Sequence, residues 1–484
     1  MLVAAGAVAA LGLAPFHWPI ATLAALVFLI WHLEHVARTP RASAVAGFLF
    51  GLGYFALALQ WIVQPFLVDA PRHGWMAPFA LALMASGMAL YWAFGLWAAS
   101  RLAGRAGALA AVLGLSFAEL LRSWLFGGFP WALLGSVWVD TPLRAAAAWG
   151  GVHALTLLTL GIAAGLASWS WRGAIWAAFC VALLGGAALI APSAGDPGAE
   201  AIRVRLVQAN ATQHLKWRED MIPVFWQRRI DFSEAPAPEP PDVVIWPEVA
   251  LPYLAGTNPE ADRRIAEAAG VPVIAGAQRR MGETLFNSII VLDRQGETAA
   301  VYDKHHLVPF GEYFPGGALA ARLGLTGLAT DALGMFSAGP GPQVLDLKDQ
   351  GLGEVLALIC YEAIFPRYGR AGNVRPDWIV QVTNDAWFGH FAGPQQHLDI
   401  ARLRATELGL PLARAANTGI SAVIGPTGEV IDQIDLNTAG YLDVSLPASL
   451  PPTLFTRIGN ALTWGALAFV SFWLLATRRG NLGA

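Results

Sequence analysis

The sequence predicts a bundle of membrane-spanning helices joined to one α/β domain. The chain has 484 residues, of which 56% are hydrophobic and only 13% are charged, whereas soluble proteins carry about 25% charged residues. The charges are concentrated in residues 200–447, while residues 1–192 and 459–477 contain very few. Long apolar runs fill the charge-poor parts, and short apolar runs alternate with helical patterns in the charged part. The net charge of −3 gives no indication of a nucleic-acid partner.

About eight segments approach the length of about 20 apolar residues that a helix needs to cross a bilayer. They are residues 1–15, 18–36, 43–65, 76–99, 106–126, 145–169, 172–192 and 459–477. The first segment is short, and Pro15 and Pro19 lie at its junction with the second, so we expect a tight hairpin there. Core helices of a soluble protein would be neither this long nor this numerous. The sequence therefore predicts a polytopic bundle in residues 1–192 and a last span at 459–477.

Arginines between the apolar segments indicate the orientation of the chain. Every second connection is basic, and the arginines concerned are Arg38, Arg41, Arg101, Arg105, Arg172, Arg478 and Arg479. Basic connections face the cytoplasm, so both termini, including the tail at 478–484, are expected to be cytoplasmic. The domain between the last two spans then lies on the opposite side. In a bacterium with two membranes, this predicts a multi-pass protein of the inner membrane with a periplasmic domain.

One pair of ionisable residues lies inside the fifth apolar segment. Glu119 and Arg122 are one helical turn apart, and Gly128-Phe129-Pro130-Trp131 follows them. Ionisable residues in a span are costly and are often functional. Two interpretations stay open: an internal ion pair that holds the helix and the connection after it, or a polar lining for the access of lipid headgroups.

Residues 201–447 have the pattern of an α/β domain between two linkers, at 193–200 and 448–458. Predicted strands are residues 204–208, 243–246, 271–275, 287–292, 297–302, 356–360, 378–382, 420–424, 429–433 and 441–444. Helical spacing predicts helices at 219–232 and 396–408. Turn residues at 293–296 and 425–428 predict two hairpins.

Cys360 ends the apolar run at 356–360, and Tyr361 and Glu362 follow it at once. α/β proteins often expose reactive side chains at the ends of buried strands. A free cysteine is more often only a packing residue, and this is the role we expect for Cys180, which lies in an apolar segment. Two cysteines in these positions leave no disulfide framework.

Two further strand ends carry groups that a nucleophilic cysteine needs. Glu248 follows the strand at 243–246, and Lys304 follows the strand at 297–302. A carboxylate can take the thiol proton, and an ammonium can stabilise the thiolate and the oxyanion of a tetrahedral intermediate. The backbone N–H of Tyr361 is a second candidate oxyanion donor. Side chains at neighbouring strand ends converge, so the sequence predicts a Glu–Lys–Cys site.

No metal or other cofactor is predicted. The chain has no CxxC or HExxH pattern and no glycine-rich phosphate loop after a strand. His305 and His306 are adjacent in an extended segment, so their side chains point to opposite faces and are poorly placed to share one ion.

Three motifs carry a family resemblance. Trp246-Pro247-Glu248, Tyr302-Asp303-Lys304 and Cys360-Tyr361-Glu362 resemble the catalytic segments of the nitrilase superfamily of carbon–nitrogen hydrolases. That resemblance implies an α-β-β-α sandwich with a Glu–Lys–Cys triad. The run at 303–313, the segment 384–389 and the N-terminal bundle are similar to the apolipoprotein N-acyltransferase family, and Glu119, Arg122 and the motif at 128–131 also match it.

The resemblance implies a role for each matching residue. Glu248 corresponds to the general base, Lys304 to the oxyanion-stabilising lysine and Cys360 to the acylated nucleophile. The residues with supporting or substrate-contacting roles in the family are Glu312, Tyr361, Glu362, Trp217 and Trp387. Trp217 and Trp387 also fit simple packing or interfacial positions.

Water competes with any acyl acceptor, so we expect apolar loop residues to line the approach to Cys360. The candidates are Leu307, Phe310, Phe314, Trp387 and Phe388.

The function implied by the resemblance is acyl transfer from a membrane phospholipid, with phosphatidylethanolamine as donor. The acyl group passes through a cysteine thioester to the N-terminal amine of a diacylated apolipoprotein. A membrane-tethered amidase of the nitrilase type, with water as acceptor, is the first alternative, because the triad is the same. A non-enzymatic transporter or scaffold is the second, and the intact Glu248, Lys304 and Cys360 argue against it.

Overall fold

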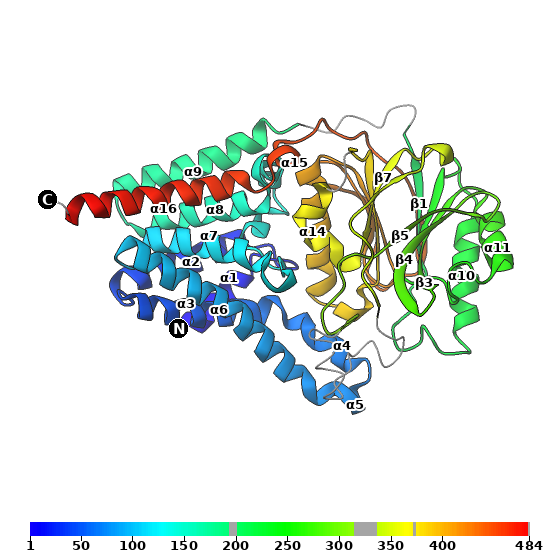
Figure 1. Ribbon diagram of the computed structural model, residues 1–484, viewed down its shortest axis with the longest axis horizontal. Helices are drawn as coiled ribbons and strands as arrows, with labels where there is room; N and C mark the ends of the chain where they lie inside the picture. The colour runs from blue at the N-terminus through cyan, green and yellow to red at the C-terminus, as the bar shows by residue number, and fades with distance from the viewer. Residues whose placement is uncertain (193–200, 314–335, 371–373, 483–484) are drawn as a thin grey trace.

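The computed structural model describes residues 1–192, 201–313, 336–370 and 374–482. A helical bundle lies at one end of the long axis of the molecule and two β-sheets lie toward the other end (Figure 1). The C-terminal helix runs along the bundle and ends away from the sheets. Phe314 and the linker predicted at 193–200 lie outside the described residues.

Eight helices of the described chain build the bundle. They are α1 (Leu2–Ala10), α2 (Pro19–His35), α3 (Pro40–Ala58), α6 (Ala77–Ala103), α7 (Ala108–Arg122), α8 (Ala147–Ala167), α9 (Trp171–Leu189) and α16 (Ala461–Leu482). Short helical turns connect them, among them α4 (Gln64–Leu67) and α5 (Ala70–His73). Each predicted apolar segment thus contains a helix. The tight hairpin predicted at Pro15 and Pro19 is present, because the N–H of Trp18 donates to the carbonyl of Leu11 at 2.9 Å.

Four helical stretches of the described chain are long and apolar enough to cross a membrane. They are Pro40–Ala58, Ala70–Ala103, Pro142–Ala167 and Trp171–Leu189. Pro19–His35 and Ala461–Thr477 are apolar but shorter. A helix of 17 residues such as α2 spans about 26 Å, less than the hydrocarbon core of about 30 Å. The membrane character is therefore supported, and the predicted number of about eight spans is not confirmed.

Glycines bring the bundle helices into close contact. A Cβ added at Gly6 of α1 would lie 1.9 Å from the carbonyl oxygen of Phe50 in α3, and one at Gly53 of α3 would lie 1.8 Å from that of Val3. Small residues of this kind let membrane helices approach closely, where packing replaces the hydrophobic effect as the stabilising force.

The sandwich consists of two mixed six-stranded sheets. The first has the order β12-β1-β2-β3-β4-β5, with β12 (Gly440–Ser445), β1 (Arg203–Gln208), β2 (Val243–Trp246), β3 (Val273–Met281), β4 (Thr284–Leu292) and β5 (Thr298–Asp303). The second has the order β11-β10-β9-β8-β7-β6, with β11 (Val430–Ile434), β10 (Ser421–Ile424), β9 (Leu412–Ala416), β8 (Trp378–Thr383), β7 (Glu354–Ile359) and β6 (Val344–Asp346). Strands β1, β2 and β3 are parallel, and so are β7, β8 and β9.

Strand β2 shows why these strands are apolar on both faces. Val243 and Ile245 belong to the core between the sheets, whereas Val244 and Trp246 pack under the outer helices α10 (Ile222–Glu234) and α11 (Pro259–Ala269). Helix α14 (Gly393–Leu408) covers the second sheet on the side of the bundle (Figure 1). The predicted α-β-β-α arrangement is therefore observed.

Most predicted elements of the domain are present, including both hairpins, β4–β5 and β10–β11. Among the α-helices and strands of the described residues in this domain, α11, β6 and β9 were not predicted. Strand β3 also continues to Met281 and pairs with β4 along its whole length. Strand β7 ends at Ile359, and Cys360 begins a short 3-10 turn, η7 (Cys360–Ile364).

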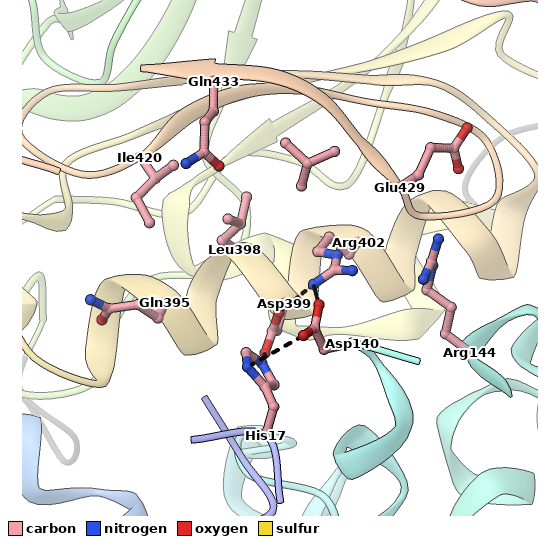
Figure 2. Close-up of a pocket in the computed structure, with 11 residues that line it drawn as sticks. His17, Asp140, Arg144, Gln395, Leu398, Asp399, Arg402, Ile420, Glu429 and Gln433 are labelled. Atoms are coloured by element: carbon pink, nitrogen blue, oxygen red, sulfur yellow. Dashed lines mark hydrogen bonds and ion pairs between the residues drawn. The ribbon is translucent and has the colours of Figure 1, made fainter. Parts of the chain in front are cut away.

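Helix α14 joins the sandwich to the bundle through polar contacts that are partly buried. The ring of His17 lies 2.7 Å from the carboxylate of Asp399, and Arg402 contacts Asp140 and Asp399 at 3.1 Å each. These residues border a hollow of about 430 Å³ between the two parts (Figure 2). The described residues that line it do not include Glu248, Lys304 or Cys360, so this hollow is separate from the site described next.

Candidate active site

The ends of three strands meet between the two sheets: β2 and β7 are buried strands, and β5 is a partly exposed one. Glu248 lies two residues after β2 and Lys304 directly after β5, both in the first sheet, and Cys360 directly follows β7 in the second. All three side chains are buried. Because the sheets pack face to face, strand ends from different sheets deliver a carboxylate, an ammonium and a thiol to one place. The structure thus brings together the three residues that the sequence singled out.

Lys304 lies between two carboxylates. Its Nζ is 2.9 Å from Oε1 of Glu312 and 3.5 Å from Oε1 of Glu248. Asn287 of β4 donates from Nδ2 to both carboxylates, at 2.7 Å to Glu248 and 2.9 Å to Glu312. Asn287 and Lys304 therefore fix the orientation of the Glu248 carboxylate, and the lysine offsets the charge of the two buried acids.

The charges of this cluster set the state of the reactive groups. Burial raises the pKa of the Cys360 thiol and the charge of Glu248 raises it further, while Lys304 lowers it. Burial alone would lower the pKa of Lys304, but the carboxylates of Glu312 and Glu248 raise it above its ordinary value. Cys360 therefore rests as a thiol that needs a base, beside a permanent cation and a carboxylate.

The backbone of Cys360 is held in an uncommon conformation. Its φ is 50°, in the left-handed region that non-glycine residues seldom adopt. The carbonyl oxygen of Cys360 accepts hydrogen bonds from Nε2 of Gln381 at 3.3 Å and from Nε2 of His397 at 3.2 Å. Nδ1 of His397 lies 2.9 Å from Asp385, which is ion-paired with Arg414. This buried polar cluster beneath the strand end fixes the direction of the Cys360 side chain and of the Tyr361 N–H.

Glu362 connects the lysine segment to the cysteine turn. Its Oε1 accepts hydrogen bonds from the Tyr302 hydroxyl at 2.7 Å and from the N–H groups of His305 and His306 at 2.8 and 3.1 Å. Its Oε2 accepts from the N–H of Ile359 at 2.8 Å. Burial raises the pKa of Glu362, but every one of these partners donates a hydrogen bond, which fits an ionised carboxylate. The same hydrogen bonds fix the position of the lysine segment relative to the cysteine turn.

Glu362→Gln is expected to lower the free energy of unfolding by about 2 kcal/mol. The amide has one accepting atom, so its NH₂ group would face the N–H of Ile359 or the donors of the lysine segment. The resulting shift of Lys304 is expected to slow acylation of Cys360 roughly 10-fold or more. Chemical denaturation and the rate of acyl adduct formation by intact mass check this. Glu297→Gln, on an exposed turn, is the matched control, and equal values for the two variants would contradict the role of Glu362.

The bundle reaches the cysteine turn through the connection after α7. The Tyr361 hydroxyl lies 3.4 Å from the carbonyl oxygen of Gly128. Arg122 forms two hydrogen bonds to Glu119 and donates to the carbonyls of Phe129, Trp131 and Ala132. The arginine thus holds the backbone against which Tyr361 rests. Of the two interpretations of the Glu119–Arg122 pair, these contacts favour the ion pair that holds the connection.

Both parts of the chain match known families. Residues 5–165 match the apolipoprotein N-acyltransferase N-terminal domain, and residues 203–450 match the carbon–nitrogen hydrolase family. An apolipoprotein N-acyltransferase from Bradyrhizobium diazoefficiens is 38% identical over 99% of this chain and 94% of its own. One from Rhodopseudomonas palustris is 36% identical over 98% of this chain and 94% of its own. The chain belongs to the apolipoprotein N-acyltransferase family.

Among solved structures, an amidase from Nesterenkonia sp. is 20% identical, with a TM-score of 0.38 over 57% of this chain and 99% of that chain. The sequence predictions of an N-acyltransferase and of a nitrilase-type domain on a membrane bundle are confirmed by the apolipoprotein N-acyltransferase relatives and by the two family matches.

The apolar residues predicted around the site of this N-acyltransferase lie in different environments. Phe388 packs between the sandwich and the bundle, with ring centroids 4.7 Å from Trp61 and 5.4 Å from Trp131. Trp387 is partly buried against the same core. Leu307 is buried in a small separate cluster, whereas Phe310 is 55% exposed. Trp217 is partly buried beside Lys216.

Several residues of the N-acyltransferase site were not found from the sequence. They are Asn287, Tyr302 as a partner of Glu362, Gln381, Thr383, Asp385, His397 and Arg414. Each is a polar residue inside or next to an apolar strand, or on the buried face of α14. A polar residue within an apolar run could have indicated these positions. Such a residue is buried with its neighbours and needs a hydrogen-bond partner, because burial without one is costly.

Proposed function

We propose that this chain transfers a fatty acyl chain from a membrane phospholipid, through a thioester on Cys360, to the α-amino group of the N-terminal diacylglyceryl-cysteine of bacterial apolipoproteins. The observation that carries the proposal is the buried Cys360 thiol, which lies near enough to Glu248 and Lys304 for both charges to shift its pKa. It belongs to a domain whose cysteine turn contacts the bundle through Tyr361. The family name of the relatives supports the acceptor.

In the first half-reaction, Glu248 takes the thiol proton of Cys360 as the sulfur attacks the ester carbonyl carbon. Lys304 and the N–H of Tyr361 donate to the oxyanion. The bond to the glycerol oxygen breaks, and the proton on Glu248 passes to that oxygen. A lysophospholipid leaves and the acyl group remains on sulfur as a thioester.

In the second half-reaction, the α-amine attacks the thioester carbonyl carbon and Glu248 takes its proton. The carbon–sulfur bond breaks, the proton returns to sulfur, and the product is an amide. The two bulky lipid substrates use one site in turn, which is the advantage of a covalent intermediate. Glu312, Asn287 and Glu362 act by holding Glu248 and Lys304 in place.

The proposal includes a location and an orientation. We assign residues 1–192 and 459–477 to the bacterial inner membrane, with about eight spans, and residues 201–447 to a periplasmic catalytic domain. The arginines in alternate connections support cytoplasmic termini. Phosphatidylethanolamine is the proposed acyl donor. A bundle that holds the catalytic domain at the membrane surface suits this chemistry. Extracting a lipid into water would cost about 0.8 kcal/mol for every CH₂ group exposed.

The test is to supply the purified full chain with phosphatidylethanolamine carrying a labelled acyl chain and with a diacylated lipopeptide. Label in an amide on the lipopeptide is the expected result. Labelled free fatty acid without lipopeptide product would instead assign a membrane-tethered hydrolase. Release of no acyl chain from any phospholipid would assign a non-enzymatic role and contradict the proposal.

A further inference from the structure

Two buried cations, one of which contacts the backbone of Glu248, take no part in the mechanism proposed above. Lys216 lies in the segment between β1 and α10, and Arg229 lies within α10. They are only 5% and 3% exposed. Both line one small hollow, and the other residues around it are Trp217, Ile222, Phe225, Ala250 and Pro252. The hollow therefore has two cationic side chains and otherwise apolar walls.

Neither cation has an anionic partner among the described residues. Nζ of Lys216 donates to the backbone carbonyl of Glu248 at 3.3 Å, and Nη1 of Arg229 donates to that of Phe225 at 3.4 Å. Nε of Arg229 is buried without a hydrogen-bond partner. Buried charges are ordinarily paired, because removing an unpaired ion from water costs several kcal/mol. Two such cations facing one hollow are the arrangement of an anion site.

The pKa shifts of Lys216 and Arg229 also indicate an anion site. Burial, and then the charge of Arg229, lower the pKa of Lys216 to about 7. Burial and the charge of Arg228 lower the pKa of Arg229 to about 10. The charge of Glu248 raises the pKa of Lys216 but only partly offsets these two effects. An anion between Lys216 and Arg229 would stabilise both charged forms.

The size of the hollow limits what can enter it. Its volume is about 10 Å³, close to the roughly 10–15 Å³ that one water molecule needs. A space of this size admits one oxygen atom of a larger anion and not the whole group. Trp217 is partly exposed at this point, and its ring lies 5.4 Å from Nζ of Lys216. A tetrahedral oxyanion such as phosphate can present a single oxygen to such a space. The guanidinium of Arg and the ammonium of Lys bind phosphate oxygens through charge-assisted hydrogen bonds.

We propose that Lys216 and Arg229 bind a phosphate oxygen, and that the ligand is the phosphodiester of the phospholipid acyl donor. This identification of the ligand rests on the proposed function. Since Lys216 touches the backbone of Glu248, a phosphate held there places the headgroup next to the general base and leaves the glycerol esters within reach of Cys360. The site selects donors that carry a phosphate and positions the ester for attack.

The experiment compares two acyl donors that differ only in the phosphoethanolamine headgroup, which contains the phosphate. The full chain is incubated with phosphatidylethanolamine or with diacylglycerol of the same acyl composition, and the rate of adduct formation on Cys360 is measured by intact mass. Lys216→Met and Arg229→Gln are expected to slow acylation by the phospholipid roughly 10- to 100-fold. The rate with diacylglycerol is expected to change far less.

The ratio of the two rates is the readout, because any general displacement of Glu248 lowers both rates alike. Arg229→Lys keeps the cation and is expected to keep the ratio. Lys348→Met and Arg264→Gln remove cations with exposed side chains and are the matched controls. An unchanged ratio in Lys216→Met and Arg229→Gln would overturn the headgroup assignment.

Inorganic phosphate distinguishes the two sources of the anion. Thermal stabilisation of the wild type by inorganic phosphate over chloride at equal ionic strength, lost in Lys216→Met, would assign free phosphate as a ligand of the site. No stabilisation together with an unchanged donor ratio would overturn the anion site. If the wild type forms no adduct with either donor, the proposed function fails, while the phosphate measurement still tests Lys216 and Arg229.

Discussion

Cys360→Ser is expected to abolish acyl adduct formation and to lower turnover roughly 10⁴-fold or more. The serine hydroxyl fits the same buried position at the end of β7, so the fold is retained. A carboxylate such as Glu248 can deprotonate a thiol, but it is too weak a base to activate an alcohol. Intact mass after incubation with phospholipid is the measurement, and the wild type is expected to gain one acyl chain that hydroxylamine removes.

Cys180 provides the internal control for this experiment. It is buried in α9 of the bundle and far along the chain from the strand ends that form the site. Cys180→Ala is therefore expected to keep the adduct and its lability. An adduct that persists in Cys360→Ser, or that moves with Cys180, would contradict Cys360 as the acylated residue.

The positions of Glu248 and Cys360 were predictable because each follows a short apolar run typical of a buried strand. Lys304 was predictable because it follows the second strand of a hairpin that turn residues indicate. Their meeting was expected from convergence at one sheet edge, but it has a different origin. Glu248 and Lys304 come from the first sheet and Cys360 from the second. The family resemblance supplied the two-sheet sandwich, since pairing between distant strands leaves no local pattern.

The contacts of Asn287 could not be predicted from local sequence patterns. It lies in the antiparallel strand β4, and its contacts with Glu248 and Glu312 depend on the register of β4 against β5. The sequence shows only a polar residue at the start of an apolar run. The cluster of Asp385, His397 and Arg414 is similar, because its members lie on three separate elements and meet only through packing of α14 on the second sheet.

The failure to predict some of the secondary structure also has a physical explanation. Strand β9 (Leu412–Ala416) is alanine-rich and has weak β-propensity, so its strand conformation comes from pairing with β8 and β10. Helix α11 is short and mostly polar. In the bundle, each predicted apolar segment contains a helix of the described chain. Apolar composition alone does not set the number of spans, since α1 has 9 residues and α7 has 15.

Lys304→Met is expected to lower acylation of Cys360 roughly 10³-fold, because it removes the cation that stabilises the thiolate and the oxyanion. It is also expected to lower the free energy of unfolding by about 3–5 kcal/mol, since breaking a buried ion pair leaves its partner charges uncompensated. The uncompensated groups are Glu312 and Glu248, whose oxygens lie 2.9 and 3.5 Å from Nζ of Lys304. Both carboxylates also accept from Asn287, so they cannot move apart without losing that bond.

A double variant separates the two roles of the lysine. Lys304→Met with Glu312→Gln leaves a single buried carboxylate, so most of the lost stability is expected to return while acylation stays low. Chemical denaturation and intact mass on the same preparations check this. Recovery of acylation together with stability would mean that Lys304 only supports the fold, whereas stability without acylation requires a cation beside Cys360 for the chemistry itself.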